Sequence, residues 1–248
     1  MKNRVELNQD AINLRKQLGL NNFDTIDLLD VVLEKLPDIT IIFCPISEKT
    51  SGICINRNNI QIICINSTMN LGRQRFTLAH ELYHLLVEKK FNLFVCNDDE
   101  RYNDSEKEAN SFASFLLMPS QALENFIDLN NISKWNLENI IKIEQHFQIS
   151  HEAMLYRLYQ DSKISYHERE NFRQIGIVRA AKNRKISSKL YERPSEPKYT
   201  VLGKYIDLIE KLDSNNVISS GKRRELLLDA FRGDLVYNFD YGDDALEE

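Results

Sequence analysis

The stretch RFTLAHELYHLL (residues 75–86) consists of good helix formers and contains neither glycine nor proline, so it predicts a helix. Within it, His80 and His84 are four residues apart, which is about one helical turn. Both imidazoles therefore project from one face and can bind one metal ion together. Glu81 lies beside His80 and can reach a water molecule on that ion. An HExxH helix is typical of two zinc ligands and the general base of a metallopeptidase. The alternative is a solvated or core-edge histidine pair without a metal.

A second helix is expected to supply the missing ligand, because a catalytic zinc ion takes three protein ligands and keeps one position open for water. Residues 105–119 (SEKEANSFASFLLMP) predict such a helix, which Pro119 ends. Glu106 lies at the N-terminal edge of its apolar face, whereas Glu108 points about 160° away from Glu106. We therefore predict Glu106 as the third ligand. Asn110, one turn later, is predicted to hydrogen-bond a ligand histidine. The alternative for Glu106 is a first-turn acid that the helix dipole favours.

Together, the two motifs resemble the ImmA/IrrE family of bacterial and phage metallopeptidases, which are of the gluzincin type. The resemblance is best over residues 39–165 and implies one Zn²⁺ ion bound by His80, His84 and Glu106. It also implies that Glu81 is the catalytic base. Many family members have glycine where this chain has Tyr83. This departure changes the packing behind the motif and removes no ligand.

The resemblance further implies a protein substrate. Members of the family cleave a helix-turn-helix transcriptional repressor, here expected to be of the XRE type. Cleavage would relieve repression in a phage, on a mobile element or during stress. A different class of function is a catalytically weak zinc-binding partner, such as a toxin–antitoxin-associated regulator that binds without cleaving. Glu81 argues against this alternative, because a pure binding protein would not need that carboxylate.

The chain before the HExxH helix predicts a small sheet. Two helices are expected at 4–20 and 24–36, followed by β-branched runs at 39–44, 51–56 and 60–66. The last two runs are joined by Arg57-Asn58-Asn59, which is typical of a hairpin. We therefore expect an α+β fold. It would have a small antiparallel three-stranded sheet packed on zincin-like helices, followed by a mostly helical C-terminal region.

Three regions are expected along the chain. Residues 1–128 would form the zinc peptidase core with both motif helices. Residues 129–165 would form a pair of helices like a helix-turn-helix, packed on the core. Residues 166–248 would form a helical region with a regulatory or partner-binding role.

DNA recognition by the helical pair (residues 135–161) is a further alternative, but charge disfavours it. Its second helix carries His151, Glu152 and Arg157, which do not make a basic surface. The net charge of −5 likewise gives no general case for a nucleic-acid partner. His146, His151 and several tyrosines are candidate donors to the oxyanion of a peptidase reaction.

Composition and cysteine usage predict a cytoplasmic protein. No apolar run approaches the roughly 20 residues of a membrane span. The first 20 residues are polar and lack the apolar segment of a secretory signal. The four cysteines have no CxxC spacing, so reduced thiols are expected, and metal binding by cysteine is not.

Overall fold

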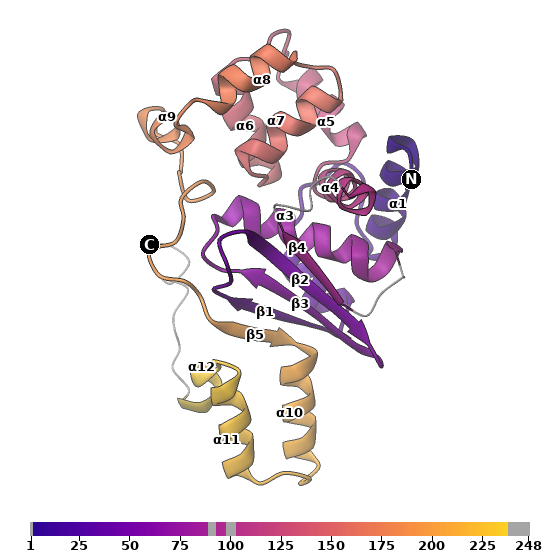
Figure 1. The fold of residues 1–248 in the computed structure, drawn as a ribbon, viewed down its shortest axis with the longest axis vertical. Coiled ribbons are helices and arrows are strands. Elements are labelled where there is room, and N and C mark those ends of the chain that lie inside the picture. Colours follow the sequence, from indigo (N-terminus) through magenta and orange to yellow (C-terminus); the bar gives the residue numbers. More distant parts are fainter. Residues whose placement is uncertain (1, 89–92, 98–102, 238–248) are drawn as a thin grey trace.

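A five-stranded sheet lies at the centre of the computed structural model, which describes residues 2–88, 93–97 and 103–237 (Figure 1). The strand order is β4-β2-β3-β1-β5. The strands are β1 (Ile39–Cys44), β2 (Thr50–Arg57), β3 (Ile60–Asn66), β4 (Leu93–Asn97) and β5 (Thr200–Gly203).

The pairing of these strands corrects part of the expected fold. β2 and β3 form the antiparallel hairpin, and its turn residues Asn58 and Asn59 both have positive φ, as a type I′ turn requires. β1 pairs with β3 in parallel, because the chain reverses once between β1 and β2 and a second time in the hairpin. β4 and β5 add antiparallel strands at the two edges. The α+β class is confirmed, but the expected three-stranded, wholly antiparallel sheet is wrong.

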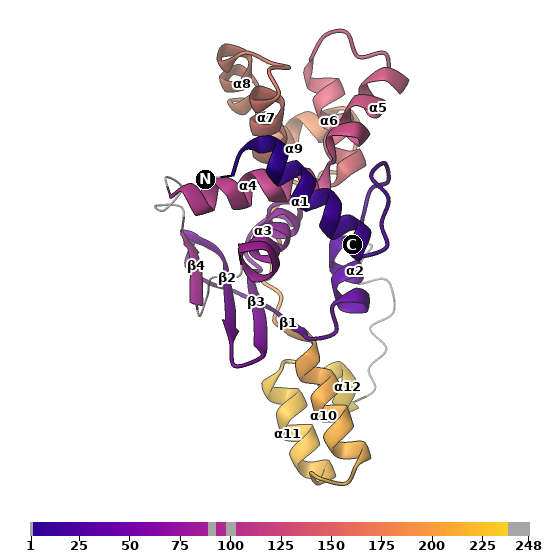
Figure 2. The same ribbon diagram turned by 90° about the vertical axis from the view of Figure 1, so that its right-hand side faces the viewer.

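The N-terminal helices cover one face of the sheet (Figure 2). Alternate strand residues, such as Ile41 and Ile63, are completely buried on that face. The elements are α1 (Arg4–Gln17), α2 (Leu28–Lys35), α3 (Leu71–Leu82), a π-helical continuation η1 (Tyr83–Glu88) and α4 (Asp104–Leu117). α3 contacts β2, β3 and α4, so it lies between the sheet and the second motif helix.

A group of five helices follows, above the sheet in Figure 1. It consists of α5 (Ser120–Leu129), α6 (Leu137–Phe147), α7 (His151–Gln160), α8 (Tyr166–Arg173) and α9 (Ile177–Asn183). Gln148, in the left-handed region at φ 55°, ends α6, and the Ser150 hydroxyl caps α7. Apolar residues of α6 and α7 belong to the same core as α3 and α4. The helical pair is therefore continuous with the sheet-bearing core.

The C-terminal part returns to the sheet through β5 and then forms α10 (Lys204–Ser214), α11 (Ser220–Asp229) and α12 (Gly233–Tyr237). Gly203 ends β5 at φ 77°, and a side chain there would collide with the carbonyl oxygen of Ile39. A small separate core around Val201, Ile209 and Leu227 holds these helices together. The segment after residue 166 is thus joined to the core by backbone pairing.

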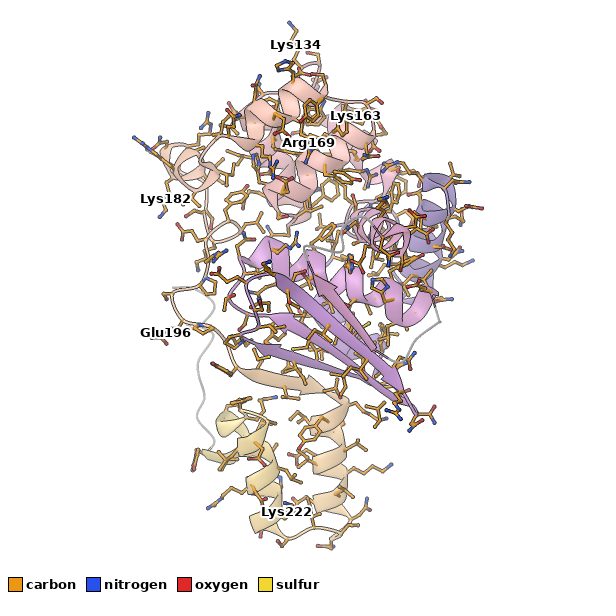
Figure 3. The ribbon with its side chains drawn as sticks, viewed as in Figure 1. Lys134, Lys163, Arg169, Lys182, Glu196 and Lys222 are labelled. Carbon is orange, nitrogen blue, oxygen red and sulfur yellow. The ribbon has the colours of Figure 1, made fainter. Side chains whose placement is uncertain are left out.

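Helices α5–α9 carry charged side chains of both signs. Figure 3 labels Arg169 and Lys182 among them. Arg169 forms an ion pair with Glu152 at 2.8 Å, and Lys182 forms one with Glu192 at 2.6 Å. Among the residues that the structure describes, no helix has both the length and the apolar character needed to span a bilayer.

Candidate metal centre and active site

Three side chains from the two motif helices converge at the C-terminal end of α3. His80 lies in the last turn of α3, His84 in η1 and Glu106 in the first turn of α4. The Nε2 atoms of the histidines are 3.2 Å apart. Glu106 places Oε2 3.2 Å from His80 Nε2 and Oε1 3.3 Å from His84 Nε2. All three residues are buried. They form the group of potential metal ligands found among the described residues.

The spacing of these atoms is close to that between two ligands of a zinc ion. Ligands about 2.0–2.1 Å from such an ion are separated from one another by roughly 3.3 Å. The two Nε2 atoms are 3.2 Å apart, and each lies 3.2 or 3.3 Å from a different oxygen of Glu106, so both carboxylate oxygens are within reach of the site. Two imidazoles and one carboxylate also leave a fourth position for water, as a catalytic site requires. His80, His84 and Glu106 therefore have both the chemistry and the geometry to hold the ion.

Electrostatics keep the third candidate ligand ionised. Burial raises the pKa of the Glu106 carboxyl, but hydrogen bonds and charge from His80 and His84 outweigh it and lower the pKa to about 2. Burial lowers the pKa of His84, yet its contacts with Glu106 and Glu88 raise the net pKa above the ordinary value. Glu106 is thus a carboxylate at neutral pH and is able to bind a cation.

Asn110 lies where helical spacing places it, one turn after Glu106. Its Oδ1 is 3.0 Å from Nδ1 of His80. When this oxygen accepts from Nδ1–H, Nε2 carries the free lone pair and is the nitrogen turned toward Glu106.

Two polar residues near His84 were missed by the sequence reasoning. Glu88 Oε2 lies 2.8 Å from Nδ1 of His84. The hydroxyl of Ser105 lies 2.9 Å from both oxygens of Glu88. The spacing of Glu88, four residues after His84 on the same helical run, was the available signal.

Glu81 lies at the interface between α3 and the sheet. It is completely buried and faces β2, where Gly52 leaves room for its carboxylate. A Cβ atom at position 52 would collide with Glu81 Oε1 and lie 2.5 Å from Cγ2 of Thr77. Burial, followed by the charge of Glu81 and a hydrogen bond to it, raises the pKa of the Cys54 thiol. The strand therefore shapes the position of the candidate base.

Glu108 points to a different set of partners. Its Oε2 accepts a hydrogen bond from the Tyr83 hydroxyl at 2.5 Å, and its Oε1 accepts one from the backbone N–H of Lys2. The Tyr83 ring packs on Phe112, with 5.4 Å between ring centroids. Tyr83 thus packs behind the motif and contacts Glu108.

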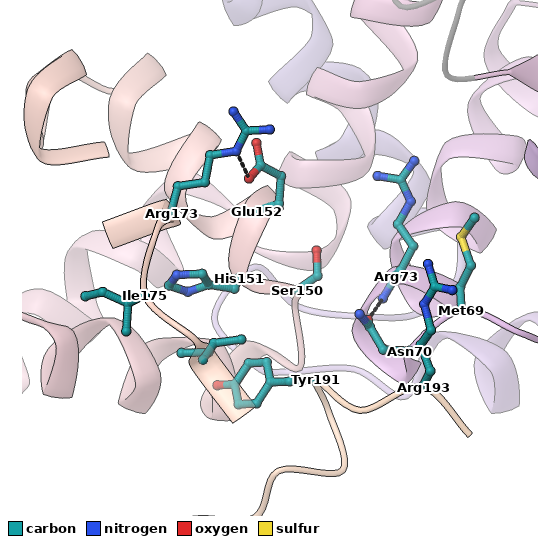
Figure 4. Close-up of a pocket in the computed structure, with 11 residues that line it drawn as sticks. Met69, Asn70, Arg73, Ser150, His151, Glu152, Arg173, Ile175, Tyr191 and Arg193 are labelled. Carbon is teal, nitrogen blue, oxygen red and sulfur yellow. Dashed lines mark hydrogen bonds and ion pairs between the residues drawn. The ribbon is translucent and has the colours of Figure 1, made fainter. Parts of the chain in front are cut away.

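The two candidate oxyanion histidines have other contacts. His151 places Nδ1 2.6 Å from Glu144 Oε1 and Nε2 3.2 Å from the carbonyl oxygen of Phe172. Figure 4 shows His151 beside a cavity of about 300 Å³, which lies at the N-terminal ends of α3 and α7. The His146 ring packs against Phe126 and Phe147, with ring centroids 4.8 and 4.7 Å away. The structure does not bring either histidine to the three-residue cluster.

Two of the three arginines that line this cavity form ion pairs with acidic residues. Arg173 Nε lies 3.1 Å from Glu152, as the dashed line in Figure 4 marks, and Arg193 lies 3.5 Å from Glu48. Since α3 rises about 1.5 Å per residue, the cavity is separated from the candidate ligands by most of the length of that helix. It is a second feature of the fold, distinct from the metal centre.

Comparison with known proteins gives three findings. The family model described as the IrrE N-terminal-like domain matches residues 34–159. The radiation response metalloprotease IrrE of Deinococcus deserti is 32% identical over 114 residues, which are 44% of this chain and 38% of that protein. The match thus spans well under half of that relative's length. A solved Mycobacterium tuberculosis transcriptional regulator is 15% identical with a TM-score of 0.44, covering 62% of this chain and 47% of that one.

Proposed function

Because the chain belongs to the family of the IrrE N-terminal-like domain, whose model matches just over half of it, we propose that it is a zinc-dependent endopeptidase. Its substrate in this proposal is a helix-turn-helix transcriptional repressor of the XRE type, and cleavage relieves repression. The observation that carries the proposal is the close approach of the Nε2 atoms of His80 and His84 to each other and to the carboxylate of Glu106, at 3.2–3.3 Å. The repressor substrate rests on the family resemblance. Cleavage of such a repressor would take place in the cytoplasm.

The proposed mechanism divides the work between four residues. His80, His84 and Glu106 would hold one zinc ion. When bound, zinc supplies Lewis-acid chemistry that polarises the scissile carbonyl and makes water a better nucleophile. Glu81 accepts the proton of the attacking water and then delivers it to the leaving amine. Its complete burial against β2 restricts the motion of this carboxylate, which follows His80 directly in the chain.

The test uses the full chain loaded with Zn²⁺ and a purified helix-turn-helix repressor of the XRE type. Mass spectrometry of the mixture should show two complementary fragments of the repressor. Glu81→Gln has nearly the same shape but does not accept a proton at neutral pH. It should retain zinc and lose about two to four decades of cleavage rate.

Other results would point elsewhere. Cleavage by Glu81→Gln at the wild-type rate would remove Glu81 from the role of base. If both forms bind the repressor and neither cleaves it, the protein acts by binding alone. A wild-type protein that binds no zinc, when purified without chelator, would contradict the metal centre itself.

A further inference from the structure

The two histidines of the metal centre have different partners on their outer nitrogens. Nδ1 of His80 faces the neutral amide oxygen of Asn110 at 3.0 Å. Nδ1 of His84 faces the carboxylate of Glu88 at 2.8 Å. A histidine binds a metal through Nε2 only when the proton is on Nδ1, and an acceptor at Nδ1 selects that form. A carboxylate also increases the basicity of the ring more than an amide does.

Glu88 is itself fixed from the other motif helix. The Ser105 hydroxyl is 2.9 Å from each of its oxygens, and Ser105 directly precedes Glu106. The side chain of Glu88 is only 14% exposed, so these contacts are largely shielded from water. A continuous polar chain therefore runs from His84 through Glu88 to the helix that carries the third ligand.

From these contacts we infer that Glu88 is a positioning residue for His84 and that Ser105 holds Glu88 in place. This inference rests on the proposed zinc site. Glu88 keeps the His84 ring in the metal-binding tautomer and aims Nε2 at the ion. Ser105 couples that orientation to Glu106, so that the two helices present their ligands together.

The test compares the zinc affinity of four variants of the full chain, measured by competition with a fluorescent chelator. Glu88→Ala should weaken affinity about 10- to 100-fold, the usual effect of removing an outer partner of a ligand. Glu88→Gln keeps an oxygen acceptor for Nδ1–H and should recover most of this loss. Ser105→Ala should weaken affinity by less than Glu88→Ala does and by more than the control variant does. Glu108→Gln is the matched control, because it changes a carboxylate that contacts Tyr83 and Lys2, and it should remain within about twofold of wild type.

Two further readouts separate positioning from general stability. Melting of the zinc-free variants shows whether each one folds; if Glu88→Ala does not fold, Ser105→Ala still decides the question. Visible absorption of the Co²⁺-loaded protein reports ligand geometry and should change in Glu88→Ala but not in Glu108→Gln.

Three outcomes would overturn the inference. They are a Glu88→Ala affinity within about twofold of wild type, an equal loss in Glu108→Gln, and absence of zinc binding by the wild type. The last would also remove the proposed function. By contrast, normal zinc binding without cleavage of any repressor would contradict the proposed function, while the affinity series would still decide the role of Glu88.

Discussion

Replacing Gly52 with alanine tests how closely β2 confines the candidate base. The new methyl group would collide with the Glu81 carboxylate and lie 2.5 Å from Cγ2 of Thr77. Neither side chain has free space to enter, because Glu81 is 0% and Thr77 only 2% exposed. Overpacking of this kind destabilises the fold by about 1–3 kcal/mol. Alanine in place of a strand glycine loses less backbone entropy on folding, which stabilises by about 0.5–1 kcal/mol. The expected net loss is about 1–2 kcal/mol in the free energy of unfolding.

The assay is thermal unfolding of zinc-free protein, in which each kcal/mol lowers the melting temperature by about 2–4 °C. Gly221→Ala is the control, because a Cβ atom there would make only an ordinary contact, 3.8 Å from the Ser219 hydroxyl, and its φ is not positive. The Gly52→Ala variant should also retain zinc while cleaving more slowly, since Glu81 is displaced and the ligands are not. Wild-type stability in Gly52→Ala, or an equal loss in Gly221→Ala, would refute the packing argument.

Three other predictions concern the metal centre and the helical core. Glu106→Ala should abolish or strongly weaken zinc binding, and Glu108→Ala should leave it nearly unchanged. Metal analysis of both proteins measures this, and loss of zinc in Glu108→Ala alone would show that Glu108 is the ligand. Burial lowers the pKa of His151, but its contact with Glu144 raises the net value above the ordinary one. The resulting stabilisation is therefore complete below about pH 6.5 and is lost as pH rises through the folded-state pKa. The urea midpoint of wild type should exceed that of His151→Gln at pH 6, and the gap should narrow toward pH 9. Arg157→Ala removes a guanidinium that is 1% exposed and should cost about 3–5 kcal/mol, which urea unfolding would reveal.

The placement of the candidate ligands follows from local helical phase. His80 and His84 lie one turn apart, and Glu106 rather than Glu108 faces them because its position matches the buried face of α4. Asn110 falls one turn after Glu106 for the same reason. These relations depend on residues a few positions apart, so the sequence pattern was sufficient to predict them.

Features that depend on distant parts of the chain were not predictable in this way. The hairpin signal around Asn58 identified the β2–β3 pairing, but nothing in residues 39–44 indicates which strand β1 pairs with. β5 has only four residues, too few for an alternating pattern, and its pairing with β1 depends on packing of the segment that follows. The π-helical turn that carries His84 also has no local sequence signature. Glu88 had a signal in its four-residue spacing from His84, which the motif itself does not include.

The position of β5 at the edge of the sheet has a consequence for folding during synthesis on the ribosome. β1 ends at Cys44 and its outer partner begins at Thr200, so the ribosome adds about 150 residues between them. At a synthesis rate of about 5–20 residues per second, the outer edge of β1 stays unpaired for roughly 8–30 s until β5 has been made. During that interval its backbone N–H and C=O groups form an open edge on which another nascent chain is able to pair. A fragment ending near residue 165 would keep this open edge permanently, so it should self-associate more readily than the full chain.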